Sequence, residues 1–427
     1  MDLREFIDQG CWVIDAVTSY LKLTGDFAFL DEKCGYYRIV DEAARSVEKS
    51  EITDTVLDHM LRIMDYLLSN KDTKTDCIKV LYGDWNDALD GLGVSADPGE
   101  KFGNGVSVMA SLQVVKNLQD IIELLEKLGI KNDICKRYQE EKRSLTNGLM
   151  KNAVVTNEKG ERRILHGWGH DRAYFVGSFH DPDNKDRYGL TSNAFWILSG
   201  LIKEDDSMKE EILSAYNALD SKYGLKTFHP AFGRDVKGVG RIYKLPVGTA
   251  ENGASYIHAT TFAIMSLFRI GESRRAWEQM EKILPFTHEK VSCSAFVMPN
   301  SYGFNPELHI DGESMQDWQT GSSNVLFKTF VRFIFGFNPD YDALTVSPAN
   351  YCPFQEFSAS FVYQGRTINL RYRKESGKVG DAAESVRHFY LNGEEMAAEY
   401  DASRRTYQLV LGKDKLADLN TITVVDS

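Results

Sequence analysis

The hydrophobic pattern of the chain changes once, at about Ala343, and this change limits the architecture more than any other feature of the sequence. Before it, apolar residues mostly recur at the spacing of an amphipathic helix. After it, polar and apolar residues alternate, as in Phe357–Arg373, where Gln364-Gly365 is expected to be the turn between two strands. The pattern therefore predicts a helical domain at 1–342 and a small antiparallel β domain at 343–427.

Nine segments of the first part are predicted to be helices. Long polar loops rich in Gly, Asn and aromatic residues join pairs of these helices. Loops of this length are usually functional or disordered, and their many Trp, Tyr and His residues favour a functional role. The succession of pairs suggests a helical toroid rather than a solenoid, although periodicity alone does not decide between the two. The predicted helices are Cys11–Leu23, Thr55–Leu68, Val106–Leu128, Ile134–Lys151, Ser192–Ile202, Lys209–Leu219, Ala259–Arg269, Arg274–Ile283 and Ser322–Ile334. Further strands are predicted at Val386–Leu391, Thr406–Leu411 and Ile422–Val425, with a hairpin turn at Asn392-Gly393.

The charge and composition of the 427 residues argue against several classes of protein. The chain has 50 Lys and Arg and 62 Asp and Glu, and this net charge of −12 argues against a nucleic-acid binder and against docking on an anionic membrane. Six widely separated cysteines without a CxxC pair indicate reduced thiols. The N-terminal sequence MDLREFIDQG has no secretory pattern and no run of 18 apolar residues occurs, so a cytoplasmic protein is expected.

The segment Val80–Gly93 is the most informative part of the sequence for function. It places two carboxylates, Asp84 and Asp87, beside the indole of Trp85, and this combination suits a catalytic site for sugars. A Trp face can stack on a pyranose ring. A carboxylic acid can protonate a glycosidic oxygen if burial or a neighbouring negative charge raises its pKa. The alternative is a loop whose Asp and Asn side chains cap the following helix.

Two further segments have residues that suit a sugar hydroxyl or an anion. The Glu251 carboxylate can accept hydrogen bonds from sugar hydroxyls, and His258 can donate to an anion. Thr320, Gly321 and Ser322 come directly before a predicted helix, and a helix N-terminus is a good site for an anion. For His258, the alternative is a structural or capping role. For the segment Thr320–Ser322 taken alone, a plain helix cap is the favoured interpretation.

A fourth segment, LHGWGHDRAYFVG, combines aromatic and polar side chains. Trp168 and Arg172 offer stacking and hydrogen bonding to a substrate. Three histidines, His166, His170 and His180, lie in the same region and could suggest a metal ion. However, the region has no HExxH motif and no Cys partner, so no metal site is expected.

Together these segments resemble the β-glycoside phosphorylases of glycoside hydrolase family 94, which includes cellobiose, chitobiose, laminaribiose and β-1,2-oligoglucan phosphorylases. The matching elements appear in the order of the family and cover most of the chain. The N-terminal stretch Tyr20–Glu32 also looks like a family segment. The matching elements are Gly83–Asp90, Gly167–Tyr174, Leu190–Leu201, Pro246–Ala259 and the sequence DWQTGSS followed by Phe335–Ala349.

The resemblance implies an (α/α)6 toroid followed by a small C-terminal β-sandwich. It also implies inverting phosphorolysis, in which a β-linked glucoside or oligoglucan and phosphate give α-sugar 1-phosphate and a shortened acceptor. Asp87 would be the general acid, with no cofactor, no metal and inorganic phosphate as co-substrate. The residues that would bind substrate are Trp85, Glu251, Trp168 and Arg172, and those that would bind phosphate are His258, Thr320 and Gly321. A phosphorylase needs such donors because phosphate is already an anionic nucleophile, whereas an inverting hydrolase needs a second carboxylate.

In the family, an N-terminal β-sandwich, a helical linker and the first toroid helices come before the region that this sequence resembles, and we expect none of them in these 427 residues. We therefore expect an incomplete toroid. Three interpretations of the chain are possible: it is a fragment, one half of a split enzyme with a partner chain, or a reduced homologue. A smaller departure is Ser322-Ser323, where the family often has Thr-Ala. Two other functions stay open: an inverting hydrolase with Glu251 as general base, and a non-catalytic carbohydrate-binding subunit. A homodimer is also expected as a possible form. The sequence does not specify the linkage or the sugar of the substrate.

Overall fold

The computed structural model describes residues 3–129, 132–290, 295–316, 321–375 and 386–427. Its internal contacts divide the chain into two compact units. The first consists of Met1–Thr18, Asp26–Leu219 and Thr227–Gly253, and the second of Ser19–Gly25, Asp220–Lys226 and Ala254–Ser427. These units do not coincide with the predicted domains 1–342 and 343–427, which were drawn where helices give way to strands.

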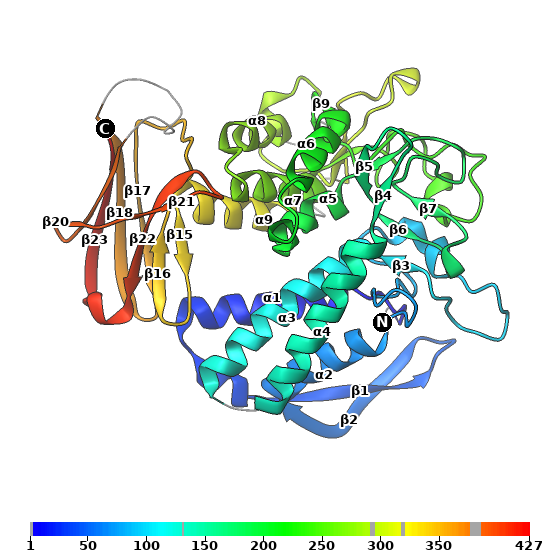
Figure 1. Cartoon of the computed structure of the whole chain (residues 1–427), viewed down its shortest axis with the longest axis horizontal. Helices are drawn as coiled ribbons and strands as arrows, with labels where there is room; N and C mark the ends of the chain where they lie inside the picture. Colours follow the sequence, from blue (N-terminus) through cyan, green and yellow to red (C-terminus); the bar gives the residue numbers. More distant parts are fainter. Residues whose placement is uncertain (1–2, 130–131, 291–294, 317–320, 376–385) are drawn as a thin grey trace. The chain divides into compact units, whose positions relative to one another are not determined.

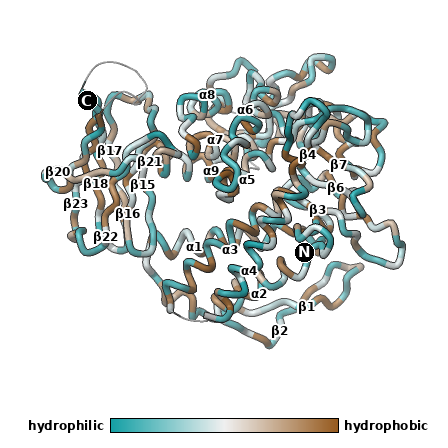
Figure 2. The backbone as a smooth tube through the Cα atoms, viewed as in Figure 1, coloured by the Kyte–Doolittle hydropathy of each residue, from teal (hydrophilic) through white to brown (hydrophobic). Residues whose placement is uncertain are grey.

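Helix α3 (Val108–Leu128) is the centre of the first unit and packs against α4 (Asn132–Asn152) and α5 (Thr191–Leu198). Two-thirds of its side chains are buried, and its hydrophobic positions are visible in Figure 2. The hydroxyl of Ser107 accepts a hydrogen bond from the backbone N–H of Ala110 (3.0 Å) and so caps the helix start. The unit also contains α2 (Val56–Ser69), α6 (Met208–Leu219) and the first half of α1 (Gln9–Thr24) (Figure 1).

A long hairpin of β1 (Lys33–Asp41) and β2 (Ser46–Thr55) precedes α2, and we did not predict it. None of its side chains is buried, and most are exposed, including the apolar ones of Tyr37, Ile39 and Ile52. Because neither face is buried, the sequence has no alternation between a core side and a solvent side that would distinguish these strands from a polar loop.

The second unit contains three helices and a β region. Helix α7 (Ile257–Arg269) is almost wholly buried and packs against α8 (Ser273–Ile283) and α9 (Ser322–Thr329), which continues into a π-helical turn, Phe330–Ile334. All nine predicted helices are therefore confirmed within the described residues. The predicted change from helices to strands is also confirmed, because β15 begins at Phe337.

Two sheets form the β region at the end of the chain (Figure 1). The turns predicted at Gln364-Gly365 and Asn392-Gly393 are both present, and all four residues have positive φ (49°, 82°, 53° and 95°). The pairing is antiparallel except between β18 and β23, which corrects our expectation of a purely antiparallel domain. These two strands are far apart in sequence, so no hairpin fixes their direction. One sheet has the order β15 (Phe337–Pro339), β16 (Ala343–Val346), β22 (Thr406–Gly412), β21 (Glu399–Asp401), and the other β17 (Glu356–Tyr363), β18 (Arg366–Lys374), β23 (Leu419–Asp426), β19 (Arg387–Leu391), β20 (Glu394–Met396).

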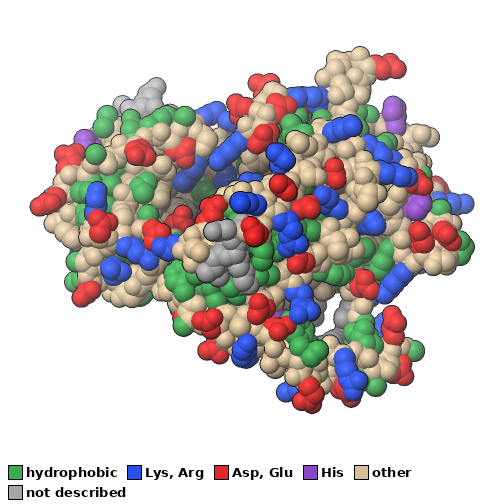
Figure 3. Space-filling model, turned by 60° about the horizontal axis from the view of Figure 1, so that its bottom comes forward, with side chains coloured by type: hydrophobic (Ala, Val, Ile, Leu, Met, Phe, Trp, Pro, Cys, Tyr) green, Lys and Arg blue, Asp and Glu red, His purple; other side chains and the backbone are tan. Residues whose placement is uncertain are grey.

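Short strands occur in the long loops between helices. They are β3 (Val106–Ser107), β4 (Val154–Thr156), β5 (Arg162–Ile164), β6 (Gly167–Trp168), β7 (Phe175–Val176), β8 (Tyr188–Gly189), β9 (Asp220–Ser221), β10 (Gly224–Leu225), β11 (Phe228–His229), β12 (Ser255–Tyr256), β13 (Ser301–Tyr302) and β14 (Ser314–Met315). Acidic and basic side chains are interspersed over the face shown in Figure 3, so the net negative charge is not gathered in one area there. Within the described ranges, we find no helix with the length and apolar character needed to cross a bilayer.

Candidate functional site

The buried carboxylate of Asp84 anchors the loop that carries Asp87. Oδ1 of Asp84 accepts a hydrogen bond from the backbone N–H of Asn86 (2.8 Å), and Oδ2 accepts one from the hydroxyl of Ser107. Burial raises the pKa of Asp84 to about 6; these two hydrogen bonds act to lower it, and the nearby charge of Asp87 acts to raise it. Asp84 therefore supports the loop from the interior, whereas Asp87, at the start of the 3₁₀ helix η2 (Asp87–Gly93), is 39% exposed at its side chain.

Asp87 forms an ion pair with Arg241, a residue that the sequence analysis missed. Nη2 of Arg241 lies 2.5 Å from Oδ2 of Asp87, and the Arg241 backbone N–H donates to Oδ1 of Asp90 (2.8 Å). The backbones here are in direct contact, because a Cβ atom added to Gly91 would lie 2.1 Å from the carbonyl oxygen of Gly238. No local motif marks Arg241, since the pair joins residues that are far apart in the chain.

A second residue that the sequence analysis missed is Asp8, which adds a carboxylate to this site. Burial raises the pKa of Asp8 to about 6, the hydrogen bond from Nε1 of Trp12 (2.8 Å) acts to lower it, and the charges of Asp84 and Asp87 act to raise it. Three carboxylates thus lie within electrostatic range of one another. The available signal was the spacing of four residues between Asp8, directly before α1, and Trp12 in its first turn.

Glu251 lies in the same unit, and the charge of Asp87 affects its pKa. Its pKa is raised, mainly because its carboxyl group is buried; a backbone hydrogen bond acts to lower the pKa, the charge of Asp87 to raise it and that of Arg241 to lower it. The Thr227 hydroxyl donates to the carbonyl oxygen of Glu251 (2.7 Å) and fixes the local backbone. The structure therefore brings together the predicted acid, Asp87, and the predicted sugar-binding carboxylate. Trp85, beside them in the sequence, is half-buried.

The three histidines of the fourth segment do not gather around one point. His166 is buried (1% exposed), with Nε2 at 4.0 Å from Oδ2 of Asp84 and without a hydrogen-bond partner. Nδ1 of His170 accepts from the backbone N–H of Asn104 (3.2 Å), and His180 is exposed. Across the described part of the chain, no three His, Cys, Asp or Glu side chains are grouped as metal ligands.

Burial lowers the pKa of His166 to about 4, from 6.5, and this shift predicts a pH-dependent stability. Between pH 6.5 and 4 the unfolded chain binds a proton at this position that the native protein does not bind, so this residue's contribution to stability falls as the pH falls. The stability of the wild type relative to His166→Gln should decrease by about 2.5 kcal/mol between pH 7.5 and pH 4.5. Urea unfolding of both proteins at the two pH values measures this difference, and a difference independent of pH would contradict the buried neutral histidine.

The buried Trp168 and the half-buried Arg172 form a contact with each other. Trp168 is 1% exposed, and the Arg172 guanidinium carbon lies 4.8 Å from the centre of its ring. Arg172 also donates to Oδ1 of Asn152 (2.8 Å). This geometry presents no open Trp168 face to a sugar, so a role for these two residues in substrate binding stays a prediction without structural support.

The predicted phosphate-binding residues that the structure describes belong to the second unit. His258 lies in the first turn of α7, and burial lowers its pKa to about 4, so its ring is neutral near pH 7. A Cβ atom added to Gly321, directly before α9, would lie 3.8 Å from Cε1 of His258. The structure thus brings His258 and Gly321 together. Thr320, the third predicted residue, lies outside the described residues.

Comparison with known proteins gives a match over most of the chain. The family model for the glycosyl hydrolase 94 superfamily catalytic domain matches residues 3–336. The chain is 28% identical over 412 residues to a solabiose phosphorylase from Paenibacillus borealis, covering 93% of this chain and 48% of that protein. It is 24% identical to an N,N'-diacetylchitobiose phosphorylase from Vibrio furnissii, covering 92% of this chain and 45% of that protein.

A third relative is a cellobionic acid phosphorylase from Neurospora crassa, 25% identical over 388 residues, which covers 87% of this chain and 44% of that protein. The chain therefore spans about half the length of the curated relatives it matches. All three relatives are named as phosphorylases, but their names give different substrates.

Proposed function

The chain belongs to the glycosyl hydrolase 94 superfamily, and from this premise we propose that it catalyses reversible phosphorolysis of a β-linked glucoside or oligoglucan. The products would be α-sugar 1-phosphate and a shortened acceptor. The observation that carries the proposal is the partly exposed Asp87 in one site with the half-buried Glu251. The names of the relatives support phosphorolysis rather than hydrolysis.

In this reaction Asp87 donates its proton to the glycosidic oxygen as the bond from that oxygen to the anomeric carbon breaks. A phosphate oxygen forms the new bond to the anomeric carbon from the opposite face, which inverts the configuration. Asp87 must first exchange the Arg241 guanidinium for the glycosidic oxygen. The two side chains are 39% and 35% exposed, so the exchange does not require a buried group to move.

Glu251 and Trp85 are proposed to bind the sugar, the first by accepting hydrogen bonds from hydroxyl groups and the second by stacking. His258, the backbone N–H of Gly321 and the hydroxyl of Thr320 are proposed to bind phosphate. A neutral imidazole can donate one hydrogen bond to the anion without protonation, which agrees with the lowered pKa of His258. No second carboxylate is needed as a base, because the nucleophile already has a negative charge.

The architecture that we propose for the whole enzyme is an (α/α)6 toroid with a β-sandwich. The nine described helices are fewer than six pairs, so such a toroid requires further helices. An N-terminal portion in the same protein or in a partner chain could supply them, and a homodimer is compatible with either form.

The synthetic direction tests the proposal. The chain, alone and together with an N-terminal portion from one of the relatives, is given α-D-glucose 1-phosphate or α-N-acetylglucosamine 1-phosphate and a panel of sugar acceptors. We expect phosphate release that requires an acceptor and is lost in the Asp87→Asn variant. Absence of phosphate release with both donors and all acceptors would contradict the proposal.

An inverting hydrolase is the second candidate, and the half-buried Glu251 favours it to a limited degree. A carboxylate whose pKa is raised by burial suits a general base that activates water. A hydrolase would release free sugar from a β-glucoside in phosphate-free buffer, whereas a phosphorylase would not. Sugar binding without either reaction would instead indicate a carbohydrate-binding subunit.

A further inference from the structure

We infer that Arg187 is a positioning residue for Glu251, acting through the backbone of residues 230–232 and the side chain of Asn252. The inference rests on the proposed function, in which the Glu251 carboxylate binds the sugar. Arg187 itself contacts none of the predicted site residues. It lies in the first unit, as do Glu251 and all the residues that connect them.

The guanidinium of Arg187 is fully buried, and it uses every one of its N–H groups. Nε donates to the carbonyl oxygen of Pro230 (2.7 Å), and Nη2 donates to that of Ala231 (3.3 Å). The other donors bind two carboxylates, Asp181 through Nη1 (2.7 Å) and Asp183 through both Nη atoms (3.0 and 2.8 Å). An arginine with this fork geometry fixes two neighbouring carbonyl groups in a way that a lysine cannot.

The two carboxylates compensate the buried charge and fix its position. Asp181 accepts hydrogen bonds from the backbone N–H groups of Gly177 (3.1 Å) and Ser178 (2.8 Å), which anchor it to the loop after β7. Burial acts to raise the pKa of Asp183, but the hydrogen bonds and charge of Arg187 outweigh this effect and lower it. The pKa of Asp181 is instead raised, because its burial outweighs its hydrogen bonds and the charge of Arg187. The ion pair of Asp183 with Arg187 is therefore the one that is ionised in the neutral pH range and keeps the guanidinium in one place.

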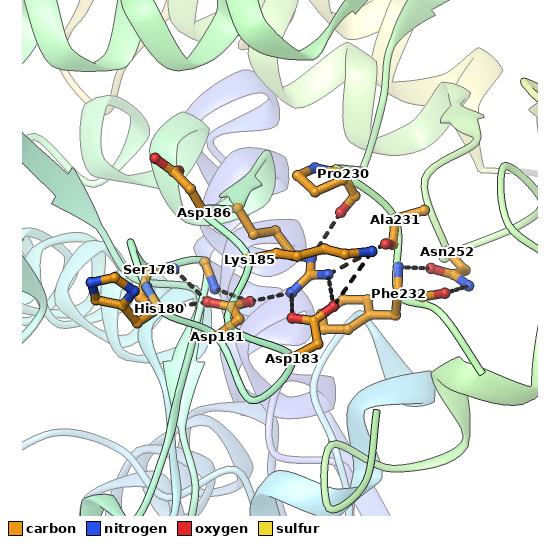
Figure 4. A network of polar contacts seen from close by, with 12 residues as sticks. Ser178, His180, Asp181, Asp183, Lys185, Asp186, Pro230, Ala231, Phe232 and Asn252 are labelled. Atoms are coloured by element: carbon orange, nitrogen blue, oxygen red, sulfur yellow. Dashed lines mark hydrogen bonds and ion pairs between the residues drawn. The ribbon is translucent and has the colours of Figure 1, made fainter. Parts of the chain in front are cut away.

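The backbone fixed by Arg187 binds in turn to the residue after Glu251. Phe232, whose ring lies 3.8 Å from the Arg187 guanidinium carbon, donates its N–H to Oδ1 of Asn252 (2.7 Å). Nδ2 of Asn252 donates to the carbonyl oxygens of Phe232 and Leu245 (2.9 Å each). Asn252 is 0% exposed, and its two hydrogen bonds with Phe232 are buried (Figure 4).

Gly253, two residues after Glu251, also packs closely against the backbone that Arg187 fixes. A Cβ atom added to Gly253 would lie 2.7 Å from Cβ of Ala231, so segments 230–232 and 251–253 are in direct contact. Within the segment 251–253, Glu251 is partly exposed and the two residues that follow it, Asn252 and Gly253, are buried. A shift of residues 230–232 must therefore move the Glu251 carboxylate, and displacements of about 1 Å in a site can reduce activity by about 100-fold.

The test compares Arg187→Lys with a matched control, Arg387→Lys. Arg387 is also buried and donates to a carboxylate, Asp426, and to two carbonyl oxygens, those of Pro348 and Ala349, in the β region. We expect both variants to lose thermal stability. Only Arg187→Lys should weaken binding of α-D-glucose 1-phosphate, by about tenfold in the dissociation constant measured by calorimetry.

A double-mutant cycle with Glu251→Gln separates positioning from general destabilisation. If Arg187 acts through Glu251, Arg187→Lys should change the dissociation constant less than twofold in the Glu251→Gln background. Equal effects in both backgrounds, or equal effects of the two lysine variants, would overturn the inference. If Glu251→Gln alone leaves the affinity unchanged, the sugar-binding role in the proposed function fails instead.

Hydrogen exchange gives a readout that does not depend on any ligand. Arg187→Lys should accelerate exchange in residues 246–253, and Arg387→Lys should not. Unchanged exchange in that segment would overturn the inference even if the wild type did not bind the sugar phosphate. Absence of binding by the wild type, with accelerated exchange in Arg187→Lys, would instead locate the failure in the proposed function.

Discussion

Replacement of Asp87 by Asn is expected to reduce turnover by about 10²- to 10⁴-fold, the range that general acids commonly contribute. The amide has nearly the shape of the carboxylic acid but has no acidic proton to give to the glycosidic oxygen. Sugar affinity and the unfolding transition should change little, because the side chain is 39% exposed and Asp84 holds the loop from the interior. Initial rates and calorimetric binding of α-D-glucose 1-phosphate measure the two effects separately.

Asp90→Asn is the matched control, since Asp90 lies in the same motif. Its Oδ1 only accepts a hydrogen bond from the Arg241 backbone, which an amide oxygen can also accept. We expect this variant to keep most of the activity. If Asp87→Asn retained turnover close to that of Asp90→Asn, Asp87 would not be the acid.

Replacement of His258 by Ala is expected to raise the KM for phosphate by about 10- to 100-fold, as for loss of one hydrogen bond to a charged group. The KM for the sugar substrate should change much less. Burial keeps the imidazole neutral, so its contribution should also be constant across the neutral pH range. Steady-state rates in the phosphorolytic direction, at several phosphate concentrations, give both constants.

His288→Ala provides a control in the same unit. His288 is half-buried, and its ring packs 4.6 Å from that of Tyr302, so the variant should lose stability without a selective effect on phosphate. An unchanged KM for phosphate in His258→Ala would remove this residue from the phosphate site. Equal increases in both variants would indicate a general loss of structure.

Sequence periodicity was enough to predict the helices and the later strands, because these elements bury one side or more in a core. The hairpin Lys33–Thr55 has no buried side and so gave no such signal. The local motif located Asp87, but Arg241 and Arg187 act through contacts between distant parts of the chain. For Trp168 the sequence suggested a site residue that the structure does not support. Its neighbours in the sequence predicted a stacking surface, but its side chain is buried in the interior.

The products formed from a β-linked disaccharide, followed by proton NMR with and without phosphate, test the central claim most directly. The predicted result is a sugar 1-phosphate with the α configuration that forms only when phosphate is present and is absent in the Asp87→Asn variant. Free sugar formed in phosphate-free buffer, or a β-configured sugar phosphate, would contradict inverting phosphorolysis by this chain.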